Sequence, residues 1–201
     1  LVENTNIYVT GALVMVMSTI LGMGVPGVAA YVIVQAVAVP VLIEVNVLPI
    51  SAHMFCLIYA CLSNITPPVA MSSYVASGIA GSNQTKTGLL SVRLGLIGFL
   101  IPFFFLDNPV LLIGADPTAT IAGSLWAFFT ASVGTVALVG GLEGWFLRKS
   151  NWLERAVLIA VAPLMLYPGS LTDAVGFGVL AAVILFQWFT RRPASPVPGN
   201  A

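Results

Sequence analysis

Residues 50–81 read ISAHMFCLIYACLSNITPPVAMSSYVASGIAG, with two short apolar arms on either side of the polar segment Ser63-Asn64-Ile65-Thr66-Pro67-Pro68. The two prolines have no backbone N–H to donate, so nearby carbonyl groups lose their helical partners. The residue before a proline is also pushed out of the α region, which affects both Thr66 and Pro67. We therefore predict that residues 50–81 form a discontinuous helix.

A second interruption precedes this segment. Apolar residues from Ile7 to Leu21 meet Gly22-Met23-Gly24-Val25-Pro26-Gly27, and apolar residues resume from Val28 to Val39. Neither arm reaches the ~20 residues of a comfortable membrane span. One continuous helix would hold a proline and several glycines in its interior, at about 1–3 kcal/mol each. We predict a re-entrant helical hairpin over residues 5–43 with the Gly-Pro cluster at its tip.

The composition indicates an all-α, polytopic membrane protein. Of the 201 residues, 59% are hydrophobic and 7% are charged, whereas a soluble domain carries about 25% charged residues. Long apolar runs such as 118–142 and 171–190 suit membrane-spanning helices. The net charge is zero, so no basic surface suggests nucleic acid as a partner.

The charged residues predict the topology. Basic loops alternate with acidic ones, and the positive-inside rule places the basic loops and the C-terminus in the cytoplasm. Glu3 and Glu44 lie at the ends of the hairpin arms, and no Lys or Arg precedes Lys86, so we expect the hairpin to open outward. We expect four further crossings at residues 89–106, 118–142, 153–167 and 171–190, and a disordered tail at 193–201.

The two interruptions together resemble an ion site. A broken helix exposes carbonyl oxygens at one half-helix end and N–H groups at the other, which suit Na⁺ and anionic groups respectively. Ser63, Asn64 and Thr66 add side-chain oxygens, the ligand type that hard cations prefer. The alternative is a pair of proline kinks that only shape packing.

Three stretches resemble one family. They are GMGVPGVAAYVIV (22–34), SNITPPVAMSSYVASGIAG (63–81) and TGLLSVRLGLIGFLIPFFFLDNPVLL (87–112). In this order they resemble the large membrane subunit of TRAP (tripartite ATP-independent periplasmic) transporters, and most closely the fused permease of the TAXI-type branch. The resemblance covers residues 5–112, and the last helices look like that branch's variable C-terminal extension.

The resemblance implies an elevator-type secondary transporter of the bacterial or archaeal inner membrane. A periplasmic binding protein would deliver an organic acid anion, and an ion gradient, commonly Na⁺, would drive uptake without another cofactor. Residues 1–112 would be the transport region of a second inverted repeat and 113–192 a transmembrane extension, cut from a longer permease whose N-terminal part is a further partner. Many relatives have Thr in place of Gly27, so a ligand role at that position is not expected. The expected ion-binding residues are Gly22, Gly24, Val25, Pro26, Ser63, Asn64, Thr66 and Pro67, and the expected substrate-binding residues are Pro68 and Ser72.

Other functions are weaker alternatives. A channel or structural membrane scaffold would explain the apolar helices but not the paired interruptions. An intramembrane enzyme needs a base beside a serine nucleophile, yet the single histidine, His53, is expected near an outer helix end as a hydrogen-bonded interfacial residue. We expect Cys56 and Cys61 to be small buried hydrophobes, and Glu143 and Glu154 to be solvated loop charges.

Overall fold

The computed structural model describes residues 6–112, 120–166 and 169–190. Within these residues the regular elements are helices, as predicted, and the chain divides into two compact units, Leu1–Trp126 and Ala127–Ala201. The all-α, polytopic membrane class is confirmed by the helical stretches that are long and apolar enough to span a bilayer. In the described part these are Gly27–Glu44, Gln84–Phe104, Ile121–Glu143 and Leu171–Phe189.

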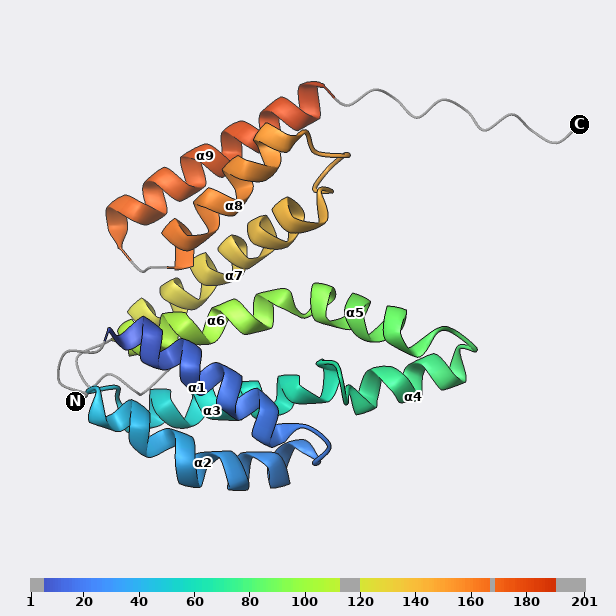
Figure 1. Ribbon diagram of the computed structural model, residues 1–201. Coiled ribbons are helices and arrows are strands. Elements are labelled where there is room, and N and C mark those ends of the chain that lie inside the picture. The colour runs from blue at the N-terminus through green and yellow to red at the C-terminus, as the bar shows by residue number, and fades with distance from the viewer. Residues whose placement is uncertain (1–5, 113–119, 167–168, 191–201) are drawn as a thin grey trace, which may run out of the picture. The chain divides into compact units, whose positions relative to one another are not determined.

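In the first unit, α1 (Ile7–Gly22) and α2 (Gly27–Glu44) form the predicted hairpin (Figure 1). The Asn6 side chain caps α1 by accepting a hydrogen bond from the backbone N–H of Tyr8 at 3.0 Å. Gly24 has φ +81° in the turn, a conformation that side-chain-bearing residues rarely adopt. The expectation that both arms are too short to cross is wrong for α2, which continues through Pro40 and has 18 residues.

The predicted discontinuous helix is also present. It consists of α3 (Pro49–Leu62), the 3-10 turn η1 (Ser63–Ile65) and α4 (Met71–Ile79). Thr66 has φ −98° and ψ 120°, the extended conformation that its position before Pro67 requires. The Pro67–Pro68 peptide bond is cis. The backbone between η1 and α4 is therefore not helical.

After the break, the chain turns back and α5 (Gln84–Leu94) lies beside α4 (Figure 1). It continues into α6 (Leu96–Asp107) and the turn η2 (Pro109–Leu111). The predicted crossing began at residue 89, but the helix begins at Gln84. The first turn of α5 is polar and is capped by Asn83, whose Oδ1 accepts from the Lys86 N–H at 3.0 Å, so hydropathy alone placed the start too late.

The second unit contains α7 (Ile121–Glu143) from Ala127 onward, together with α8 (Trp152–Leu166) and α9 (Ser170–Phe189). Its apolar core includes Leu158 and Met165. The expected crossing at 153–167 corresponds to α8, whose 15 residues fall short of the ~20 that span a bilayer comfortably. The predicted disordered tail at 193–201 lies outside the described residues.

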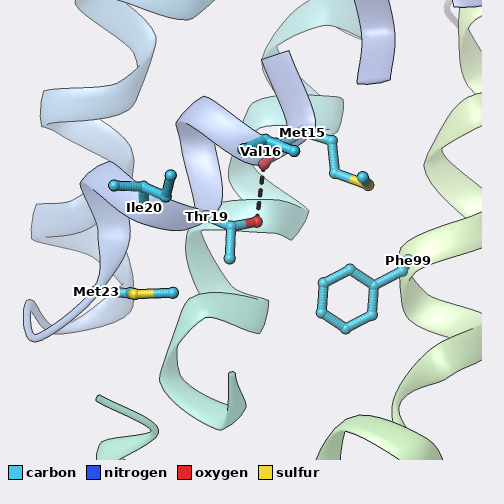
Figure 2. A pocket seen from close by; sticks show the side chains of 6 residues that line it. All are labelled: Met15, Val16, Thr19, Ile20, Met23 and Phe99. Atoms are coloured by element: carbon cyan, nitrogen blue, oxygen red, sulfur yellow. Dashed lines mark hydrogen bonds between the residues drawn. The ribbon is translucent and has the colours of Figure 1, made fainter. Parts of the chain in front are cut away.

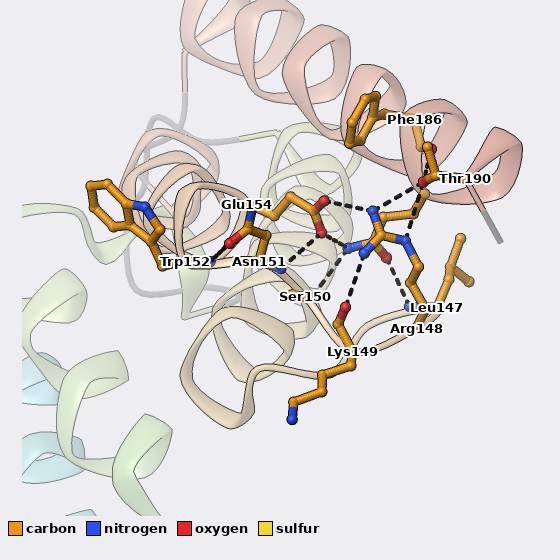
Figure 3. Close-up of polar contacts among 10 residues, drawn as sticks. Leu147, Arg148, Lys149, Ser150, Asn151, Trp152, Glu154, Phe186 and Thr190 are labelled. Carbon is orange, nitrogen blue, oxygen red and sulfur yellow. Dashed lines mark hydrogen bonds and ion pairs between the residues drawn. The ribbon is translucent and has the colours of Figure 1, made fainter. Parts of the chain in front are cut away.

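A polar network joins the loop before α8 to α9, as Figure 3 shows. Glu154 accepts from Arg148 at 2.7 Å and from the side-chain amide of Gln187 at 2.7 Å. Gln187 is fully buried and Glu154 is 9% exposed. The expectation of a solvated loop charge at Glu154 is therefore wrong, because the fold places this carboxylate between two helices where it needs internal partners.

Candidate functional site

The hairpin tip and the helix break lie against each other. A Cβ added to Gly22, the last residue of α1, would lie 2.8 Å from Oγ of Ser63 and 3.2 Å from both Cα and the carbonyl oxygen of Ala60. Real Cβ atoms almost never approach other heavy atoms to less than 3.0 Å. The lack of a side chain at Gly22 is thus what lets the end of α1 reach the end of α3.

The rest of the hairpin tip also lies against residues on either side of the break. A Cβ on Gly24 would lie 3.7 Å from Cγ1 of Val69, and a Cβ on Gly27 would lie 3.3 Å from Sγ of Cys61. The tip therefore contacts both the last turn of α3 and the segment just before α4. Cys61 is exposed, so the expectation of a buried thiol holds for Cys56 but is wrong for Cys61, because α3 ends beside an open region.

The hairpin tip and the break each carry two helix ends. The carbonyl ends of α1 and α3 are brought together by the Gly22 contact. The amino ends of α2 and α4 follow the same two interruptions. Terminal carbonyl groups carry partial negative charge and terminal N–H groups partial positive charge. The arrangement can thus attract a cation on one side and an anion on the other.

Polar side chains of the break turn back onto α3. Ser63 Oγ donates to the carbonyl of Ala60 at 2.6 Å, and Thr66 Oγ1 donates to the carbonyl of Leu62 at 2.7 Å. Asn64 donates through Nδ2 to a carbonyl of the same turn at 3.3 Å. A hydroxyl oxygen that donates its hydrogen keeps lone pairs, and the Asn64 amide keeps a carbonyl oxygen. These neutral oxygens suit a hard monovalent cation.

Acidic metal sites are not an alternative within the described residues. No group of three or more His, Cys, Asp or Glu side chains gathers there. Divalent cations such as Ca²⁺ are generally held by several carboxylates. A cation at the break would instead depend on hydroxyl, amide and backbone oxygens.

The opposite side of the break is covered by α5 and α6. A Cβ on Gly88 would lie 3.3 Å from Cγ of Pro67, and a Cβ on Gly95 would lie 2.7 Å from Cδ1 of Ile65. The Tyr74 hydroxyl donates to the carbonyl of Pro68 at 2.8 Å. The break is therefore held between the hairpin tip and a helix that glycines allow to approach closely.

The predicted substrate residues are more exposed than Ser63 and are not among the residues that the hairpin tip contacts. Pro68 and Ser72 are both exposed, and the contacts of the tip reach Ser63 and Val69 rather than Ser72. Ser73, which the sequence did not single out for binding, is 4% exposed, and its Oγ has no hydrogen-bond partner among the described residues. No sequence signal separates Ser73 from Ser72, because only helix packing decides which hydroxyl is buried.

His53 bonds to a neighbouring helix. Its Nδ1 lies 2.7 Å from the hydroxyl of Tyr31, so the pair joins α3 to α2. The Tyr31 hydroxyl is therefore used in a bond to a neighbouring helix. This contact ties the second arm of the hairpin to α3, at a level away from the break.

An apolar groove lies beside the tip, between α1 and α6, as Figure 2 shows. Its volume is ≈ 260 Å³, and it is lined by Met15, Val16, Thr19, Ile20, Met23 and Phe99. The Thr19 hydroxyl donates to the carbonyl of Met15 at 2.8 Å and so is satisfied within its own helix. The groove therefore offers apolar contact and no charge to a ligand.

Comparison with known proteins supports a transport function. Residues 2–117 match the sequence profile of the tripartite ATP-independent periplasmic transporter, DctM component. No curated protein and no solved structure matches the chain. The matched residues include the hairpin, the break and the helix that covers it, and they make up more than half of the chain. The chain belongs to the family of DctM components of tripartite ATP-independent periplasmic transporters.

Proposed function

We propose that this protein is the ion-coupled membrane component of a TRAP transporter of the TAXI-type branch and imports organic acid anions. The observation that carries the proposal is the contact between Gly22 and Ser63, which joins two interrupted helices at their carbonyl ends. Discontinuous helices with paired ends are the usual way in which secondary transporters bind ions and substrates at membrane depth. Membership of the DctM family supports the transport role.

In this proposal Na⁺ binds between the tip and the last turn of α3. Gly22, Gly24, Val25 and Pro26 supply backbone oxygens from one side, and the segment from Ser63 to Pro67 supplies oxygens from the other. The close packing of Gly22 on Ala60 supports this location. The hydroxyls of Ser63 and Thr66 support it as well, because both donate to α3 carbonyls and so place their oxygens at the end of this helix. A cation there also offsets the partial negative charge of two helix ends.

The substrate anion binds at the amino end of α4, next to Pro68 and Ser72. The first N–H groups of a helix have no intrahelical partners and attract carboxylates. Ser73 adds a buried hydroxyl that lacks a partner among the described residues. The cation and the anion would then lie on the two sides of one break, so that each stabilises the other's binding.

The partners follow from the family. A periplasmic binding protein delivers the substrate, and the hairpin opens toward it as a re-entrant element of the inner membrane. An N-terminal repeat completes the site with a second hairpin and a second broken helix, and the two move as an elevator. The lack of any Lys or Arg before Lys86 supports an outward-opening hairpin.

Uptake of labelled organic acids by proteoliposomes tests the function directly. The complete permease is reconstituted with and without its binding protein, and with or without an inward Na⁺ gradient. Uptake that needs both supports the proposal. Uptake driven by a pH gradient and indifferent to Na⁺ keeps the transport role but moves the coupling to protons. A folded permease that takes up no organic acid under any gradient contradicts the proposed function.

A further inference from the structure

Tyr59 is the largest fully buried side chain near the break. It lies on α3, and its exposed fraction is 0%. Its ring packs on Phe55, with ring centroids 4.7 Å apart, and on Phe103, with centroids 6.3 Å apart. Tyr59 precedes Ala60 directly, so it belongs to the helical turn that meets the hairpin tip.

The Tyr59 hydroxyl makes one specific bond across two helices. It donates to the backbone carbonyl of Phe99 at 2.6 Å, one turn before Pro102 in α6. The acceptor is main chain, so this bond fixes the position of α3 relative to the α6 backbone rather than to a mobile side chain. A buried hydroxyl needs such a partner, because an unpaired buried hydroxyl costs free energy.

Two close contacts extend this attachment toward the break. A Cβ on Gly98 would lie 3.2 Å from Cδ2 of Leu62, and a Cβ on Gly95 would lie 2.7 Å from Cδ1 of Ile65. From Tyr59 to Ile65, one face of the chain therefore rests on α6 and on the α5–α6 junction. The other face presents the carbonyl of Ala60 and Oγ of Ser63 to Gly22.

We propose that Tyr59 is a positioning residue for the coupling ion. It does not touch the ion, but its bond to Phe99 holds the last carbonyls of α3 at the distance from the hairpin tip that cation binding needs. The inference rests on the proposed function, because it assumes that Na⁺ binds between these two elements. Through the bond from Tyr59 to Phe99, α6 would affect ion affinity although it belongs to neither the hairpin nor the broken helix.

The chain contains a matched control for this inference. The Tyr31 hydroxyl also makes one hydrogen bond, to Nδ1 of His53, at a level of α3 away from the break. Replacing either tyrosine with phenylalanine removes one hydroxyl and keeps the ring. Of the two, Tyr59 bonds the last turn of α3 to α6, so its replacement alone should alter the ion site.

The test is binding of ²²Na⁺ to the purified complete permease without substrate. Tyr59→Phe should weaken Na⁺ affinity by about three- to tenfold, the equivalent of one net hydrogen bond. Tyr31→Phe should stay within about twofold of wild type, because its bond to His53 lies away from the break and distant sites couple weakly. Melting temperatures of all variants are measured beside the affinities.

The outcomes separate the two proposals. If wild type binds Na⁺ and Tyr59→Phe binds it with unchanged affinity, whatever its melting temperature, the positioning role is wrong and the ion site stands. Equal weakening in Tyr59→Phe and Tyr31→Phe also overturns it, because the effect would then not be specific to the bond between α3 and α6. If wild type binds no Na⁺, the proposed Na⁺ coupling is wrong and the positioning role falls with it.

Discussion

Gly22 and Ser63, which are 41 positions apart in the sequence, pack so closely that a Cβ added to Gly22 would lie 2.8 Å from Oγ of Ser63. This contact places the carbonyl end of one half-helix against the carbonyl end of another. Such an arrangement concentrates partial negative charge in a region that lacks clustered acidic side chains among the described residues. It therefore favours a cation that binds neutral oxygens.

Replacing Gly22 with alanine should displace the tip. The added methyl meets backbone atoms of Ala60 at 3.2 Å, which cannot move independently of α3. Because small errors in the placement of a site are costly, we expect uptake to fall by about ten- to hundredfold. Initial uptake rates in proteoliposomes, normalised to folded protein, provide the measurement.

The matched control for that variant is Gly78→Ala on α4. A Cβ at Gly78 meets nothing within 4 Å, and alanine is the better helix former by about 1 kcal/mol. Uptake should stay near wild type in this variant. Equal losses of uptake in Gly22→Ala and Gly78→Ala would mean that transport does not depend specifically on the contact between Gly22 and α3.

Thiol labelling should report the state of the break. Cys61 is exposed beside the tip, whereas Cys56 is 0% exposed, so a maleimide should modify Cys61 alone. Na⁺ should slow this reaction severalfold, because an ion held between the tip and the last turn of α3 would keep these two contacting segments together. Mass spectrometry of the labelled peptide follows the rate, and Cys61→Ser should abolish it. A labelling rate that is the same in Na⁺ and in K⁺ would count against an ion bound between the tip and α3.

The second unit provides a prediction about stability rather than transport. Glu154→Gln removes the charge that Arg148 contacts at 2.7 Å and disturbs the bond to buried Gln187. Because hydrogen bonds to charged groups are worth more than neutral ones, we expect a loss of about 1–3 kcal/mol in unfolding free energy. Thermal unfolding in detergent measures the change.

Lys149→Gln is the control for Glu154→Gln. Lys149 neighbours Arg148 in the same loop but is exposed, and exposed substitutions usually stay within about 0.5 kcal/mol. If the two variants lower the melting temperature equally, the buried network does not stabilise the unit as the contacts suggest.

Backbone chemistry explains why the sequence predicted the two interruptions well. The consecutive Pro67 and Pro68 remove two helical N–H donors, whereas α2 tolerates the single Pro40 in its interior, and Gly24 and Pro26 favour a turn. Helix boundaries near polar residues were harder to predict. The start of α5 at Gln84 was missed because the cap from Asn83 compensates for the low hydropathy of its first turn.

The features that could not be predicted from the sequence depend on contacts between segments that are far apart in the chain. The predicted facing of the two breaks follows the hydrophobic packing of α1 on α3, but no local pattern identifies Gly22 rather than Gly24 as the contact. The bond from Tyr59 to Phe99 and the burial of Glu154 and Ser73 likewise depend on packing between helices. A hydropathy pattern contains no information on such pairs.

The most direct test of the account is the Na⁺ dependence of uptake by the complete permease carrying both Asn64→Ala and Thr66→Ala. The control carries Ser82→Ala and Thr87→Ala, which remove a bonded hydroxyl pair at the exposed turn between α4 and α5. If a cation binds at the break, the Asn64/Thr66 variant needs at least about tenfold more Na⁺ for half-maximal uptake, since two oxygen ligands are lost, while the Ser82/Thr87 control matches wild type. An unchanged Na⁺ dependence in the Asn64/Thr66 variant would contradict a cation site at the break.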